Sequence, residues 1–107
     1  MTKKEIQYYA SLNKKKFREL ESLFLVEGKR IVDEGMNSSF STEILFFTDE
    51  FGLHNHKLIT KYQSLSVRIE KIDTRSFKKI TDTKNPQGIA AVFKKKEADI
   101  NKFGTKN

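Results

Sequence analysis

Residues 23–32 read LFLVEGKRIV, and this stretch constrains the fold more than any other part of the chain. Residues 23–26 are four consecutive apolar residues with polar neighbours on both sides, which is typical of a buried strand. Gly28 interrupts the run, and apolar residues then recur at the spacing of one helical face. The stretch therefore predicts a strand, a turn and a helix in succession, with Glu27 and a Lys-Arg pair at the junction.

The same alternation continues along the chain. Apolar runs at residues 44–47 and 89–93 predict two further buried strands, and an alternating pattern at residues 67–70 predicts a strand with one wet face. A capping box at residues 2–5 and an N-cap at Asp73 mark helix starts. The resulting order, in which helices and strands alternate, predicts an α/β fold: a three-layer α/β/α sandwich with a mostly parallel four-stranded sheet. The wholly apolar strand at residues 89–93 should be central and covered on both faces.

Size and composition set the outer limits. The chain has 107 residues, which suits one domain with one core. It contains no Cys, which excludes disulfides and thiolate metal sites. It has no apolar run near the roughly 20 residues of a membrane helix, and no signal-peptide core at its start. We therefore expect a cytoplasmic protein with no membrane partner.

The positive charge is concentrated near the ends of the chain. The net charge is +7, and residues 1–30 hold eight Lys or Arg against four Asp or Glu. The cluster KKKFR at residues 14–18 is its densest part. Such a cluster either grips phosphates, with Phe17 stacking on a base, or is a solvated linker that Phe17 anchors to the core. The predicted RNA contacts of this cluster are Lys14, Lys15, Lys16 and Arg18.

A second polar cluster is the turn NPQG at residues 85–88. The amides of Asn85 and Gln87 carry donors and acceptors suited to base edges or to the ribose hydroxyl of unpaired RNA. The turn could equally be structural and shape the entry to the last strand. Arg30, in the first turn of its helix, would project near any bound phosphate.

Catalytic and metal-binding patterns are missing from the sequence. There is no phosphate-binding glycine loop and no nucleophile constellation. His54 and His56 form an H-x-H pair without a third His or a Cys, so we expect an exposed pair and no metal site. We assign no catalytic residue.

Two segments resemble one family. FR at residues 17–18 followed by LFLVEGKR at residues 23–30 resembles the K-x-R…lFLVEG opening of SpoU/TrmH-family RNA methyltransferases. DTKNPQGIAAV at residues 82–92 resembles that family's DT-x-NPQG-I-x-AV segment, about 60 residues further along in both cases. On the matching positions, the resemblance points to Arg18, Arg30, Asn85 and Gln87 as RNA contacts, and to Glu27, Gly28, Pro86 and Gly88 as motif positions. Glu27 could instead cap its helix or pair with a neighbouring Arg.

The resemblance covers residues 1–96 and implies the family's N-terminal substrate-binding domain, which is similar in fold to ribosomal and kink-turn-binding proteins. Residues 97–107 are then expected to be a linker towards a C-terminal catalytic domain absent from this chain. In the family, that domain binds S-adenosylmethionine and methylates a ribose 2′-hydroxyl in ribosomal or transfer RNA. This chain alone is expected to be inactive and to bind neither the cofactor nor a metal.

The sequence thus predicts an RNA-binding domain, for rRNA or tRNA, of an S-adenosylmethionine-dependent RNA 2′-O-ribose methyltransferase. The resemblance also leaves room for a homodimeric parent enzyme. One alternative is a stand-alone RNA-binding protein of the kink-turn or ribosomal type. Another is a protein-interaction module that binds no RNA at physiological salt.

Overall fold

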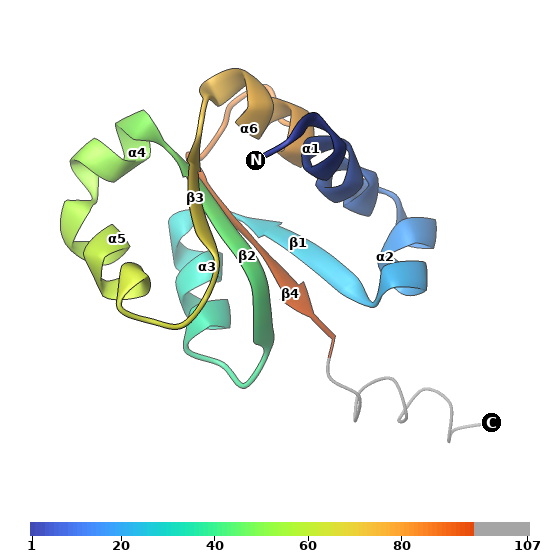
Figure 1. Ribbon diagram of the computed structural model, residues 1–107, viewed down its shortest axis with the longest axis horizontal. Helices are drawn as coiled ribbons and strands as arrows, with labels where there is room; N and C mark the ends of the chain where they lie inside the picture. The colour runs from blue at the N-terminus through green and yellow to red at the C-terminus, as the bar shows by residue number, and fades with distance from the viewer. Residues whose placement is uncertain (96–107) are drawn as a thin grey trace.

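The computed structural model describes residues 1–95, so the expected linker at residues 97–107 lies outside the described residues. The strands are β1 (Leu23–Glu27), β2 (Ser41–Thr48), β3 (Ile69–Ile72) and β4 (Ile89–Lys94). The helices are α1 (Lys3–Ala10), the 3₁₀ helix η1 (Ser11–Asn13), α2 (Lys15–Glu21), α3 (Lys29–Met36), α4 (Asp49–His54), α5 (His56–Gln63) and α6 (Thr74–Thr81) (Figure 1). None of the helices within residues 1–95 is long and apolar enough to cross a membrane.

The four strands form one sheet in the order β1-β4-β2-β3. The α/β class is confirmed, but the expectation of a mostly parallel sheet is wrong. In the described chain only β2 and β3 pair in parallel, whereas β4 is antiparallel to both β1 and β2. The cause is the segment at residues 82–88, which carries the chain back from the end of α6 to the edge where β3 ended. β4 therefore starts at that edge and runs back between β1 and β2 (Figure 1).

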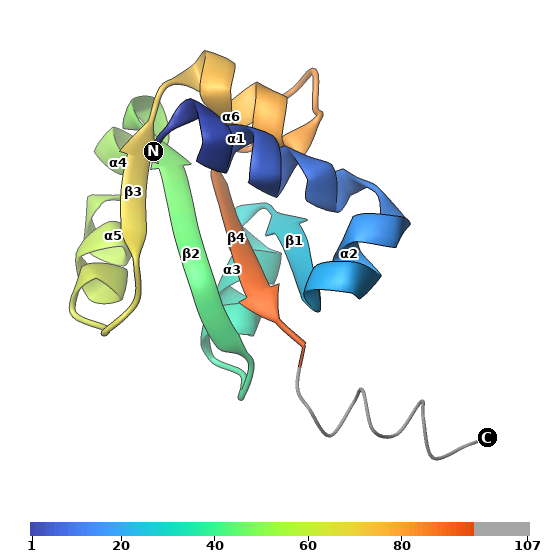
Figure 2. The same cartoon turned by 45° about the vertical axis from the view of Figure 1, so that its right-hand side comes forward.

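Helices cover both faces of the sheet, as the three-layer prediction requires (Figures 1 and 2). On one face, apolar residues of α1, η1 and α6 pack against β2 and β4; they include Tyr9, Leu12, Phe77, Ile80, Phe46 and Val92. On the other face, α3 and α5 supply the cover, with Val32, Ile59, Tyr62, Leu45, Phe47 and Phe93. On each face, large side chains from the helices and the strands together therefore fill the space between the helices and the sheet.

β4 is one of the two interior strands, together with β2, as its apolar sequence predicted. All of its residues from Ile89 to Phe93 are buried. α3 approaches β4 closely at Gly35, where an added Cβ would lie 2.3 Å from the ring of Phe93. On the same face, the Tyr62 hydroxyl of α5 donates to an Asp33 carboxylate oxygen of α3 at 2.5 Å. Burial, followed by this hydrogen bond, raises the pKa of Tyr62.

Three local expectations need correction. β1 is an edge strand, so Leu23 is buried but the rest of β1 is only half-buried. The cluster at residues 14–18 is not a linker, because residues 15–21 form α2, which ends at Ser22 in the left-handed conformation. The polar sequence around the two histidines indicated a loop, but His54 ends α4 and His56 begins α5; both are exposed, as expected.

Candidate functional site

One edge of the sheet gathers most of the predicted site residues. β1, β2 and β3 end at this edge and β4 begins there, because Glu27 is in register with Ala90, Phe47 with Ile89, and Thr48 with Ile72. The helices α3, α4 and α6 all begin at the same edge, directly after these strands. The turn at residues 85–88 therefore lies among three helix N-termini. Ligands of α/β proteins commonly bind at such an edge.

The two motif segments are joined by hydrogen bonds although about 60 residues separate them. A carboxylate oxygen of Glu27 accepts from the backbone N–H of Gln87 at 2.8 Å. Beside this bond, the N–H of Gly28 donates to the carbonyl of Ile89 at 2.9 Å. Glu27 makes no ion pair among the described residues, so its partner is the turn rather than an arginine. The end of β1 and the entry to β4 thus hold each other in place.

Gly88 joins the turn at residues 85–88 to the end of β2. Its carbonyl accepts from the N–H of Thr48 at 2.9 Å, and its φ of +87° favours glycine. An added Cβ would lie 2.9 Å from the Cβ of Phe51. The close approach that this glycine permits is therefore to α4 of the same chain. Gly28 has a φ of +116°, and an added Cβ there would make ordinary contacts, at 3.8 Å to Ile31 and 4.0 Å to Gln87. It starts α3 without a side-chain cap.

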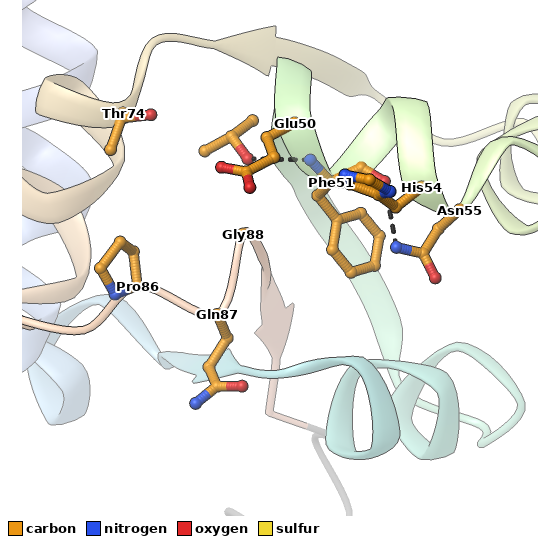
Figure 3. A pocket seen from close by; sticks show the side chains of 9 residues that line it. Glu50, Phe51, His54, Asn55, Thr74, Pro86, Gln87 and Gly88 are labelled. Carbon is orange, nitrogen blue, oxygen red and sulfur yellow. Dashed lines mark hydrogen bonds between the residues drawn. The ribbon is translucent and has the colours of Figure 1, made fainter.

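A small pocket of about 250 Å³ lies between the turn and α4 (Figure 3). Nine residues line it: Thr48, Glu50, Phe51, His54, Asn55, Thr74, Pro86, Gln87 and Gly88. The Thr48 hydroxyl accepts from the N–H of Phe51 at 3.3 Å, and the Asn55 amide donates to the Phe51 carbonyl at 3.0 Å, so α4 is held at both ends. In Figure 3 the Phe51 ring hangs below α4 beside Gly88, and the Gln87 amide points away from both the ring and Glu50. An aromatic ring beside carboxylate and amide groups suits one planar, polar ligand group such as a base.

The three helix N-termini differ in what they offer. Thr48 caps α4, which also has two carboxylates in its first turn, and Asp73 caps α6 through the N–H of Ser76. α3 has no such cap and begins with Lys29 and Arg30, both exposed. The Arg30 side chain is 94% exposed and lies 3.5 Å from Glu34, an arrangement that holds the arginine only weakly. α3 therefore presents unpaired N–H groups together with two cations.

The predicted cations of α2 lie away from this edge, because β1 starts beside α2 and ends at the site (Figure 1). Lys15 is 3.8 Å from Glu19, and the Lys16 amine lies 5.8 Å from the centre of the Phe17 ring. Half-buried Arg18 donates to the carbonyl of Leu12 at 3.0 Å, which ties α2 to η1. Lys14 is exposed at the start of α2. The structure thus brings Arg30, Asn85 and Gln87 together with Glu27, Gly28, Pro86 and Gly88, and leaves Lys14, Lys15, Lys16 and Arg18 as a separate group.

Sequence reasoning missed several residues of the pocket: Glu50, Phe51, Asn55 and Thr74. Glu50 and Thr74 follow directly after β2 and β3, so their place at the carboxyl ends of strands was the available signal. His54 lines the pocket and was expected only as part of an exposed pair. Within residues 1–95, no group of three or more His, Cys, Asp or Glu is placed to hold a metal ion.

Comparison with known proteins identifies relatives of this arrangement. Residues 3–91 match the family model of the MRM3-like substrate binding domain. The fold is similar to that of the SpoU methyltransferase AviRb from Streptomyces viridochromogenes, with a TM-score of 0.74 and 14% identity over 94% of this chain and 38% of that one. It is also similar to an RNA 2′-O ribose methyltransferase, with a TM-score of 0.71 and 26% identity over 90% of this chain and 36% of that one. For an rRNA methyltransferase from Sinorhizobium meliloti the TM-score is 0.70 and the identity 18%, over 90% of this chain and 35% of that one.

These relationships differ in what they cover. The chain spans little more than a third of the length of these solved structures. No curated protein gave a significant match to the sequence. The family match, in contrast, spans most of the described residues, including both motif segments and the edge where they meet. The chain belongs to the family of MRM3-like substrate-binding domains.

Proposed function

We propose that this domain binds RNA and presents it to the catalytic domain of an S-adenosylmethionine-dependent RNA 2′-O-ribose methyltransferase that modifies rRNA or tRNA. The observation that carries the proposal is the edge at which the Glu27–Gln87 hydrogen bond joins the two motif segments beside an uncapped helix N-terminus. Two of the similar structures are named as RNA methyltransferases, which supports the same substrate class.

The chemistry of this edge suits unpaired RNA. The side chains of Asn85 and Gln87 are exposed, and each amide carries both donors and acceptors. The first turn of α3 adds free N–H groups with Lys29 and Arg30, a combination that attracts phosphate. The neighbouring pocket adds the ring of Phe51, on which a splayed base can stack. One edge of the sheet therefore offers groups that can contact the phosphate, the sugar and the base of a nucleotide.

The methyl transfer itself belongs in this proposal to a separate domain. S-adenosylmethionine supplies the methyl group, and we place its site in the catalytic domain. The pocket at this edge has about 250 Å³, less than the roughly 300–1,000 Å³ of typical small-molecule sites. Because the pocket is this small, we derive no step of the transfer from this chain. Its contribution is affinity and orientation of the ribose.

Paired amide variants test the proposal. Asn85→Ala with Gln87→Ala removes two polar side chains from the edge, and Asn37→Ala with Gln63→Ala removes the same two types from exposed positions elsewhere. If each amide contributes about 0.5–1.5 kcal/mol, the first double variant should bind a labelled unpaired RNA about 5- to 150-fold more weakly. The control should bind like the wild type. Equal binding by the two double variants would remove the edge as the site, and no RNA binding by the wild type at low salt would refute the function.

A further inference from the structure

We propose that a trough between α1 and α6 carries the sugar-phosphate backbone of the RNA strand next to the nucleotides held at the edge. This inference rests on the proposed function. The trough has about 910 Å³ and is open. α1 and α6 lie side by side in both views (Figures 1 and 2). The trough is lined by Lys3, Ile6 and Gln7 from α1 and by Thr74, Arg75, Ser76, Lys78 and Lys79 from α6.

Four of these eight residues are cations and none is acidic. Nearby carboxylates are committed to other partners. Glu5 of α1 accepts from Arg68 at 2.6 Å and from the N–H of Thr2 at 3.0 Å. Asp73 caps α6 through the N–H of Ser76. These carboxylates therefore do not neutralise the positive charge of the trough, which can attract a polyanion.

Helix stability explains the positions of only some of these cations. Lys78 and Lys79 suit the last turn of α6, but Arg75 is in the first turn, where a cation is unfavourable. Arg75 and Lys79 are also like charges at i and i+4, which repel. Lys3, Lys78 and Lys79 have no carboxylate within 4.0 Å among residues 1–95, whereas Lys61 of α5 is 4.0 Å from Asp33. Cations arranged in this way are available to a ligand.

The trough adjoins the pocket at the edge, because Thr74, the first residue of α6, lines both. A strand held in the pocket would therefore have the trough beside it. No residue that lines the trough is aromatic, which argues against stacking of bases along it. Lys, Arg and hydroxyl groups along an open channel are the usual partners of phosphate oxygens. The trough therefore fits the backbone, and the pocket fits a base.

Two charge-matched double variants test the inference in the full chain. Lys78→Gln with Lys79→Gln acts on the trough, and Lys94→Gln with Lys95→Gln acts on the end of β4 that is remote from the edge. Both lower the net charge from +7 to +5, so long-range attraction changes equally. The probe is a labelled single-stranded RNA of mixed sequence, titrated at several salt concentrations. Thermal melts of each variant confirm that it folds.

The expected result follows from counterion release. Loss of two phosphate contacts to a single strand should reduce the slope of log affinity against log salt by about 1.4, which is about 25-fold in affinity at 0.1 M salt. The variant at Lys94 and Lys95 should retain the wild-type slope. If wild-type protein binds RNA and the two double variants behave alike, the inference is overturned and the proposed function stands. If wild-type protein binds no RNA at low salt, both are overturned.

Discussion

The bond between Glu27 and Gln87 gives the sharpest prediction about how the site is built. Its donor is a backbone N–H, its acceptor is a half-buried carboxylate, and the two atoms lie 2.8 Å apart. Hydrogen bonds to charged groups contribute about 1.5–3 kcal/mol, and water can reach the exposed Gln87 once the bond is lost. We therefore expect Glu27→Ala to lower the free energy of unfolding by about 1–2 kcal/mol.

The size of this effect can be read from thermal melting. A domain of about 100 residues unfolds with an entropy near 0.2 kcal/mol/K, so the loss corresponds to about 5–10 °C in Tm. Glu34→Ala is the control, because this carboxylate is 67% exposed and makes only the i,i+4 pair with Arg30. That variant should melt within about 2 °C of the wild type. If the two variants melt at the same temperature, Glu27 does not hold the two motif segments together.

Three further predictions concern single residues. Gly88→Ala should cost about 2–4 kcal/mol, seen as a large drop in Tm, because it combines a positive φ with a contact of 2.9 Å to the Cβ of Phe51. Arg18→Ala should lower stability by about 1 kcal/mol in denaturant melts by breaking the link between α2 and η1; an unchanged midpoint would make that link unimportant. Hydrogen bonding to Arg68 lowers the pKa of Glu5 from 4.5 to about 2, so the stability from this pair is present above pH 4.5 and is lost as pH falls towards 2. Arg68→Gln should therefore flatten the decline of Tm in this range, and an unchanged pH profile would contradict it.

Local patterns predicted the elements well where one residue type decides the outcome. The capping box at Thr2 and Glu5 is present with both of its hydrogen bonds, and Asp73 caps α6. The apolar run of β4 correctly marked an interior strand, because a strand covered on both faces has no polar positions. These features depend on residues within a few positions of each other, which a sequence displays directly.

Features that depend on distant parts of the chain were not predictable in the same way. The turn signal at residues 82–88 indicated a break in the chain, but not that the chain returns to the edge where β3 ends. The predicted direction of β4 was therefore wrong. The role of Glu27 could not be predicted without knowing where Gln87 lies in the fold. The role of Arg18 likewise depends on where the carbonyl of Leu12 lies. No local pattern marked Phe51 as a residue of the pocket, because only the folded chain places it against Gly88. Tertiary contacts decide each of these cases.

Mapping bound RNA on the domain tests the central claim most directly. In ¹⁵N-labelled protein titrated with unpaired RNA at low salt, we expect the largest amide shift changes in three segments: residues 28–31, residues 85–88 and residues 74–79. α5 and the surface around Leu65 should change little. Changes confined to α5 and β3, or no change at any RNA concentration, would contradict the account that this edge of the sheet is where the domain holds its substrate.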